Sequence, residues 1–107
     1  AAASVPKMTL VSAPSAGGSI STRSFIPHRV HASVGVFAAI TVATATRFKS
    51  GPAADLAVLP EGGRYRIEHP TGAMEAFLDL AGDGSIRGAG TVRTARKLFE
   101  GYVFPRD

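Results

Sequence analysis

The chain has 107 residues, 45% of them hydrophobic and 7% aromatic, so its length suits one domain with a modest core and excludes two. It contains no cysteine, which excludes disulfides, thiolate metal sites and a cysteine nucleophile, and we expect a cytoplasmic protein. The net charge of +4 favours an anionic partner only if basic residues cluster. They alternate with acids instead: Arg64 and Arg66 interleave with Glu68, which indicates a solvated strand face and no nucleic-acid partner.

Two strands are predicted in the first quarter of the chain. Residues 7–13 form a short apolar run that ends at Pro14, and residues 19–26 are rich in β-branched and hydroxyl side chains and end at Pro27. The intervening segment, residues 15–18, is the best candidate for a flexible loop. Residues 1–6 have neither an initiator methionine nor the layout of a signal peptide, so we interpret the chain as a piece of a longer one.

One helix is expected, over residues 31–48. Its apolar residues occur around the whole circumference, which predicts burial on all sides. A membrane span is the competing interpretation, but Ser33, Thr41 and other hydroxyl residues interrupt the stretch and amphipathic strands flank it, so we expect no membrane partner. Gly51-Pro52 ends the helix.

The remainder reads as β structure. Alternating residues over 64–69 and 74–80 predict a hairpin that turns at residues 70–72. Asp83-Gly84 is a turn signal, and residues 85–104 continue as one or two strands with bends or bulges at Gly88 and Gly90. The fold class is therefore α+β, with an antiparallel-rich sheet wrapped around one buried central helix.

The candidate site is the corner at residues 27–33, where a strand passes into the helix. The N–H groups and the dipole at a helix start favour carboxylate or phosphate, and His28, Arg29 and His31 add to that preference. The alternative is that His28 or His31 caps the helix and satisfies local backbone. No third ligand accompanies the two histidines, so we expect no metal.

The other candidates are weaker. His69, on the inward face of its strand, could act as a general acid or base, although a satisfied core or turn histidine is the simpler interpretation. Gly82-x-Gly84 lacks the third glycine of a dinucleotide fingerprint. Glu75 and Asp79 alternate with apolar residues on an outward face, so they are interpreted as solvated charges. Reaction type does not follow from these residues.

Four segments together carry a family resemblance. They are residues 6–14, 21–31, 67–72 and 92–105. In their order and spacing the chain resembles the C-terminal part of the methylaconitate isomerase and 4-oxalomesaconate tautomerase family, which has the diaminopimelate-epimerase-like fold. The resemblance implies a protein of two lobes, each a curled, barrel-like sheet around a central helix, with this chain as an incomplete C-terminal lobe.

The resemblance also implies a function. Family members move a proton or a double bond in small unsaturated di- or tricarboxylates by acid and base groups, without metal or organic cofactor. Those groups, such as a lysine and a cysteine, belong largely to the other lobe, so no catalytic residue is assigned here and the segment alone is expected to be inactive. His28, His31, Ala32 and Ser33 match this lobe's share of the substrate pocket, gripping a carboxylate through side chains and helix-start N–H groups.

One departure from the family pattern concerns Val30, which stands where relatives often carry cysteine. A thiol therefore cannot act at this point, and a non-catalytic binding or assembly module of the same fold is the competing hypothesis. The expected partners are a small carboxylate, the missing N-terminal lobe and a second copy in a homo-oligomer.

Overall fold

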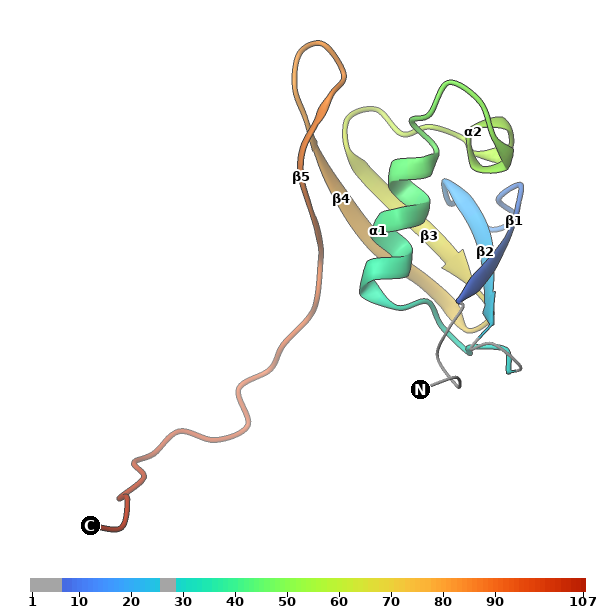
Figure 1. Cartoon of the computed structure of the whole chain (residues 1–107). Helices are drawn as coiled ribbons and strands as arrows, with labels where there is room; N and C mark the ends of the chain where they lie inside the picture. Colours follow the sequence, from blue (N-terminus) through green and yellow to red (C-terminus); the bar gives the residue numbers. More distant parts are fainter. Residues whose placement is uncertain (1–6, 26–28) are drawn as a thin grey trace.

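A five-stranded mixed sheet is the main layer of the computed structural model, which describes residues 7–25 and 29–107 (Figure 1). The strands are β1 (Met8–Ser12), β2 (Ile20–Phe25), β3 (Arg64–His69), β4 (Gly72–Leu80) and β5 (Ile86–Thr91), and the helices are α1 (Val36–Ala45) and α2 (Pro52–Leu56). The strand order is β1-β2-β3-β4-β5. This arrangement confirms the α+β class, but the expected barrel-like sheet is wrong for this chain, because the sheet is open.

Strand direction follows from the connections. Short loops join β1 to β2, β3 to β4 and β4 to β5, and all three pairs are antiparallel. β2 and β3 are parallel, with Ile20 opposite Ile67, and parallel neighbours require a crossover. The segment that holds α1 and α2 supplies it. The predicted strands over residues 7–13 and 19–26 and the hairpin at 64–80 are thus confirmed within the described residues.

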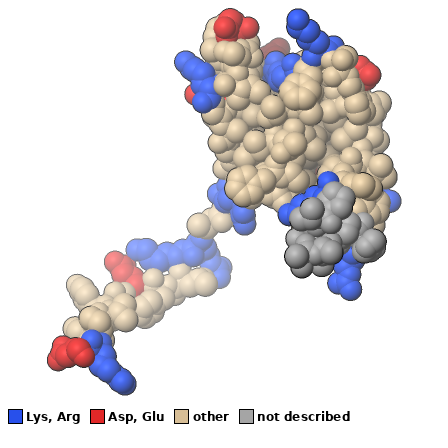
Figure 2. All heavy atoms as spheres, in the orientation of Figure 1, with Lys and Arg blue, Asp and Glu red and all other residues tan. Residues whose placement is uncertain are grey.

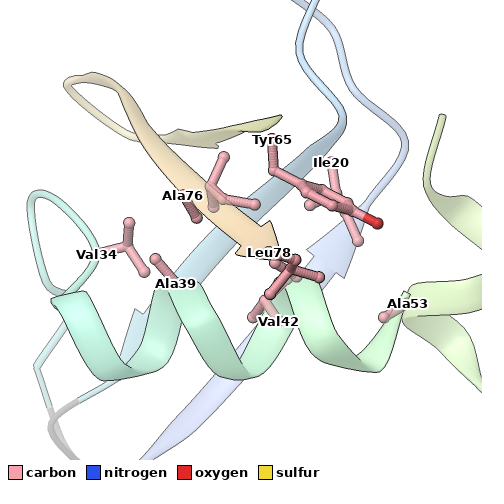
Figure 3. Packing of buried hydrophobic residues seen from close by; sticks show 10 residues of the cluster. Ile20, Val34, Ala39, Val42, Ala53, Tyr65, Ala76 and Leu78 are labelled. Atoms are coloured by element: carbon pink, nitrogen blue, oxygen red, sulfur yellow. The ribbon is translucent and has the colours of Figure 1, made fainter. Parts of the chain in front are cut away.

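The hydrophobic core lies between α1 and one face of the sheet (Figure 3). Ala39, Val42 and Ala43 are the buried residues of α1, and the sheet side chains Tyr65 and Leu78 meet them with at most 1% exposure. Small residues on this helix face let the helix approach the sheet closely. Burial of this single layer is what holds the helix, since a ten-residue helix is marginal alone.

Three expectations about the helix are wrong. α1 begins at Val36 and ends at Ala45, so it is shorter than the predicted 31–48, and a second helix, α2, begins at Pro52, where none was expected. Burial is also one-sided, because Phe37 is 84% exposed. The apolar residues occur around the whole helix, but the described residues of this chain cover only one side of it. None of the helices among the described residues is long and apolar enough to span a membrane.

Glu68 is buried, contrary to the solvated face predicted for it. The side chain is 4% exposed, and its carboxylate accepts the N–H groups of Ser15, Ala16 and Gly18 at 2.9, 2.9 and 2.7 Å. These three hydrogen bonds, that from Ser15 above all, hold the pKa of Glu68 below its ordinary value of 4.5, although burial opposes them. The expected flexible loop at residues 15–18 is therefore tied to β3.

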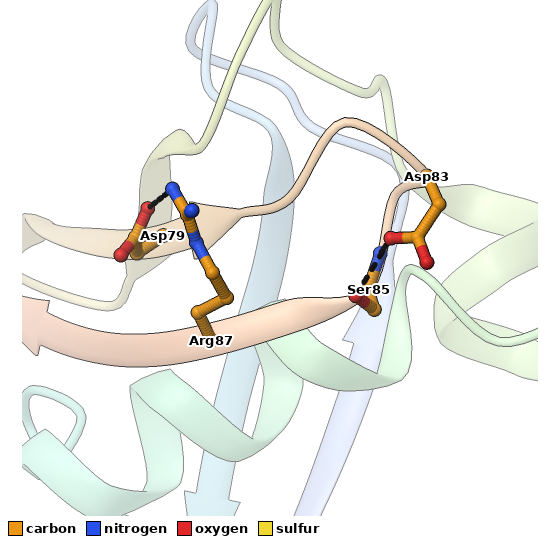
Figure 4. A network of polar contacts seen from close by, with 4 residues as sticks. All are labelled: Asp79, Asp83, Ser85 and Arg87. Atoms are coloured by element: carbon orange, nitrogen blue, oxygen red, sulfur yellow. Dashed lines mark hydrogen bonds and ion pairs between the residues drawn. The ribbon is translucent and has the colours of Figure 1, made fainter.

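The β4–β5 hairpin ends in the predicted Asp83-Gly84 turn (Figure 4). Gly84 has φ +87°, and Asp83 accepts the hydroxyl of Ser85 at 2.7 Å and its N–H at 3.0 Å, which lowers the pKa of Asp83. Arg87 reaches back to Asp79 at 2.9 Å. The register slips by one residue beside Gly88, since Asp79 faces Gly88 but Leu80 faces Ile86. The bulge thus lies at Arg87, next to the expected Gly88, whereas Gly90 pairs regularly with Phe77, so the bulge expected there is wrong.

The C-terminal segment, residues 92–107, extends away from the sheet (Figures 1 and 2). All its residues are exposed, including Leu98, Phe99 and Tyr102 at 80, 81 and 91%. The strands predicted as far as residue 104 therefore end at Thr91. The Val92 N–H still donates to the Glu75 carbonyl at 3.3 Å, but beyond Val92 no described residue forms a strand with this segment.

Candidate functional site

The predicted corner lies at the carboxyl ends of the parallel strands β2 and β3. After β2 the chain returns: Val30 forms an isolated bridge with Phe25, and the N–H of His31 donates to the Ser24 carbonyl at 2.8 Å. His28 and Pro27 lie outside the described residues. In open α/β sheets the edge formed by the carboxyl ends of parallel strands is where ligands bind. The described part of the corner is thus held at a favourable edge.

His31 and Ser33 contact each other rather than starting the helix. The N–H of Ser33 donates to His31 Nδ1 at 3.0 Å, while α1 begins only after Gly35. The helix start therefore does not lie at residues 31–33 as expected, and the Ser33 N–H already has an acceptor; the carboxylate grip by these residues stays a prediction. The side chains remain available: with Nδ1 as acceptor, the neutral His31 ring carries its proton on Nε2.

His69, at the end of β3, joins this group. Its Nε2 lies 3.3 Å from Ser33 Oγ, and its Nδ1 accepts the N–H of Thr71 at 3.3 Å. The Thr71 hydroxyl donates to the Ala32 carbonyl at 2.6 Å. The two-residue turn between β3 and β4 thus fixes the corner loop from the other side. Three of the four predicted site residues, His31, Ala32 and Ser33, lie together in one hydrogen-bonded cluster.

Sequence reasoning missed Thr71 and placed His69 outside the site. The only sequence signal was the turn Pro70-Thr71-Gly72, which identifies a hairpin but not its neighbour. His69 and Ser33 are 36 positions apart in the sequence. The parallel pairing of β2 with β3 brings them together.

A groove of about 710 Å³ between β1, β2 and α1 opens beside His31. It is mainly apolar, Lys7 is the one charged residue among its described lining residues, and its volume is typical of small-molecule sites. The first turn of α1 carries no acidic residue, and Gly35 makes no side-chain cap. Among the described residues no group of three or more potential ligands could hold a metal ion. The side chains of the corner can therefore donate hydrogen bonds to a ligand, and none of the described residues that line the groove carries a negative charge.

Val30, where the family resemblance led us to expect cysteine, is 48% exposed at the bridge to Phe25. Its side chain offers neither a hydrogen-bonding group nor a charge. Glu75 and Asp79 pair with Arg64 and Arg87 on the outer surface, in agreement with the predicted solvated charges. Figure 2 shows basic groups at several separate places on the face that it presents.

The described residues thus form an open α+β unit in which an apolar groove of small-molecule size lies beside a cluster of hydrogen-bonding side chains. The chain belongs to the PrpF protein family, whose pattern matches residues 1–106. It is 52% identical over 103 residues to the (4E)-oxalomesaconate Delta-isomerase of Novosphingobium sp. strain KA1, covering 94% of this chain and 29% of that protein.

Two further relatives agree. The chain is 52% identical over 101 residues to the 4-oxalomesaconate tautomerase of Pseudomonas putida, covering 92% of this chain and 28% of that protein. It is 32% identical over 101 residues to the putative isomerase YbhH of Escherichia coli K12, covering 94% and 29%. The chain thus spans under a third of the length of these relatives. The predicted family resemblance is confirmed.

Proposed function

We propose that this chain provides the carboxylate-binding side of an isomerase or tautomerase that acts on small unsaturated di- or tricarboxylates without a cofactor. The relatives named for oxalomesaconate support the substrate class, since 4-oxalomesaconate is a carboxylate with a movable double bond. In this proposal His31 Nε2–H and the Ser33 hydroxyl donate to a substrate carboxylate, together with His28. The acid and base that move the proton come from the rest of the protein.

The observation that carries this proposal is the cluster of His31, Ser33 and His69 at one end of the parallel strands. Fixed donors aimed at an anion bind it better than mobile ones, because their orientation costs nothing on binding. The groove of about 710 Å³ opens beside His31 of this cluster, none of the described residues that line it is acidic, and its volume has room for a tricarboxylate. His69 lines a separate pocket of about 400 Å³, which also contains Arg23.

The test uses the full-length protein that carries this sequence. Incubation with aconitate-like or oxalomesaconate-like substrates in D₂O should exchange a substrate proton, which NMR detects. Replacing His31 with Ala should raise KM about tenfold, the loss of one hydrogen bond to a charged group. The proposal would be contradicted if the protein exchanged a proton of no di- or tricarboxylate that is tested.

The competing function is a non-catalytic binding or assembly module. Val30 favours it, because a thiol is missing at a position where relatives often have one. Carboxylate titration does not separate the two functions, since both bind. Turnover does: loss of turnover on replacing His28 and His31 is expected only for the enzyme.

We further propose that the exposed surfaces of this chain contact the remainder of a two-lobed protein with the diaminopimelate-epimerase-like fold, in which residues 1–107 form part of the C-terminal lobe. The support is exposed apolar area: Phe37 on α1, Leu10 on the edge strand β1, and Leu98 and Phe99 in the C-terminal segment are 61–84% exposed. Such area is costly in water. Inactivity of the isolated chain, a homo-oligomer and a cytoplasmic location stay predictions.

A further inference from the structure

A chain of hydrogen bonds connects the β3–β4 turn to the candidate site. It runs from the Thr71 backbone N–H to His69 Nδ1, and from His69 Nε2 to Ser33 Oγ, each at 3.3 Å. None of these contacts involves Asp, Glu, Lys or Arg. Which atom donates in each hydrogen bond decides whether the Ser33 hydroxyl proton is free to bind a ligand.

The Thr71 backbone determines the direction in which these hydrogen bonds are donated. The Thr71 backbone N–H can only donate, so His69 Nδ1 is its acceptor; Thr71 Oγ1 also lies 3.3 Å from Nδ1, but its proton goes to the Ala32 carbonyl. With Nδ1 as acceptor, the neutral imidazole carries its hydrogen on Nε2, and that Nε2–H donates to Ser33 Oγ. The Ser33 hydroxyl proton is then not used by His69 and is left for a ligand.

The Thr71 side chain fixes the same loop a second time. Its hydroxyl donates to the Ala32 carbonyl at 2.6 Å, so the backbone just before Ser33 is held by the β3–β4 turn. Ser33 N–H, in turn, donates to His31 Nδ1 at 3.0 Å. The hydroxyl of Ser33 thus extends from a loop whose backbone is fixed on both sides.

We propose that His69 and Thr71 are positioning residues that orient the Ser33 hydroxyl so that it donates to a carboxylate of the substrate. This inference rests on the proposed function and assigns it two residues that act through Ser33. In this proposal His69 acts through Ser33: its Nε2–H occupies one of the two acceptor positions of Ser33 Oγ, so the hydroxyl proton is turned away from His69 and toward the substrate.

The proposal requires that the effects of substituting His69 and Ser33 on KM are not additive in the full-length protein. His69→Leu should raise KM for the carboxylate about tenfold with kcat unchanged, because a hydrogen bond present equally in the ground and transition states is weakened. Ser33→Ala should have a similar effect. In the Ser33→Ala background, His69→Leu should add nothing, because its target is gone. Independent, additive increases in KM would overturn the proposal.

His69→Gln is the matched conservative variant. The glutamine amide places an N–H donor near the position of Nε2, so KM should return to within about threefold of the wild type, which corresponds to a fraction of a hydrogen bond. A merely structural role would not distinguish a donor from an apolar side chain of similar size. Ser85→Ala, at the distant β4–β5 turn, controls for hydroxyl removal and should leave KM unchanged. Equal KM values for the Leu and Gln variants would overturn the proposal.

Ring ¹⁵N NMR of the ligand-free protein tests the same inference without turnover. Long-range ¹H–¹⁵N correlations of neutral His69 should show the proton on Nε2. A proton on Nδ1 would overturn the positioning proposal even if the enzyme is active. Absence of turnover in the wild type would instead contradict the proposed function, and the tautomer would then decide the positioning proposal by itself.

Discussion

Glu68 Oε2 accepts the backbone N–H of Gly18 at 2.7 Å, across 50 positions of sequence. The same carboxylate holds the N–H groups of Ser15 and Ala16, so one side chain of β3 fixes the whole β1–β2 loop. Gly18 has no room for a side chain: a Cβ there would lie 2.7 Å from Glu68 Cγ. The loop and the carboxylate fit as a unit.

Replacing Glu68 with Ala should lower the free energy of unfolding by about 2 to 3 kcal/mol, because three backbone donors lose a charged acceptor. Urea denaturation measures the change. Glu75→Ala is the matched control: its pair with Arg64 is exposed on both sides, so we expect a loss below about 1 kcal/mol. Equal losses in the two variants would contradict the role given to Glu68.

The stability of the chain should fall in acid through the same residue. The pKa of Glu68 is lower in the folded than in the unfolded chain, mainly because of the Ser15 N–H, so the unfolded state takes up a proton first as pH falls. The contribution is complete above the unfolded value, near 4.5, and is lost as pH falls through the folded pKa. Denaturation at a series of pH values should show this loss, and it should be smaller in Glu68→Gln.

Replacing Gly63 with Ala should disrupt the start of the β3–β4 hairpin. A Cβ at Gly63 would lie 1.7 Å from the Leu78 carbonyl oxygen, and backbone cannot give way as a flexible side chain can. We expect a loss of about 3 kcal/mol or more. Gly88→Ala in β5 is the control, since nothing lies within 4 Å of its Cβ position. Thermal denaturation separates them; similar melting temperatures would contradict the close approach.

The hydroxyl of Tyr65 should contribute to stability because it is buried and fully used. Tyr65 is 0% exposed, and its hydroxyl is hydrogen-bonded to Thr46 at 2.9 Å and to Arg47 Nε at 2.6 Å. Tyr65→Phe should cost about 1 to 2 kcal/mol, since Arg47 loses an acceptor. Tyr102→Phe, at 91% exposure, should cost nothing measurable. Urea denaturation of both variants checks this, and an unaffected Tyr65→Phe would show that water replaces the hydroxyl.

Local sequence patterns predicted the helices and strands of this chain better than they predicted which elements lie next to each other. The alternation of residues predicted the β3–β4 hairpin, because consecutive residues of a strand point to its two faces. The same alternation assigned Glu68 to solvent, since the loop that covers it comes from 50 positions earlier. His69 was placed outside the site for the same reason. Burial was predicted for the apolar helix that contains Phe37 and for the strand that contains Leu98. The elements that would bury these two side chains are not among the described residues.

The C-terminal segment provides the last prediction. Because residues 92–107 are all exposed, replacing both Leu98 and Phe99 with Asp should leave the unfolding free energy of the 107-residue chain within about 0.5 kcal/mol of the wild type. In the full-length protein the same change should lower the melting temperature, because these side chains would then be buried against the remainder. Differential scanning calorimetry of both proteins checks this. A control change of the exposed pair Lys97 and Glu100 to Ser should affect neither protein. Equal behaviour of the Asp variant in the long and short proteins would show that the segment does not contact the remainder.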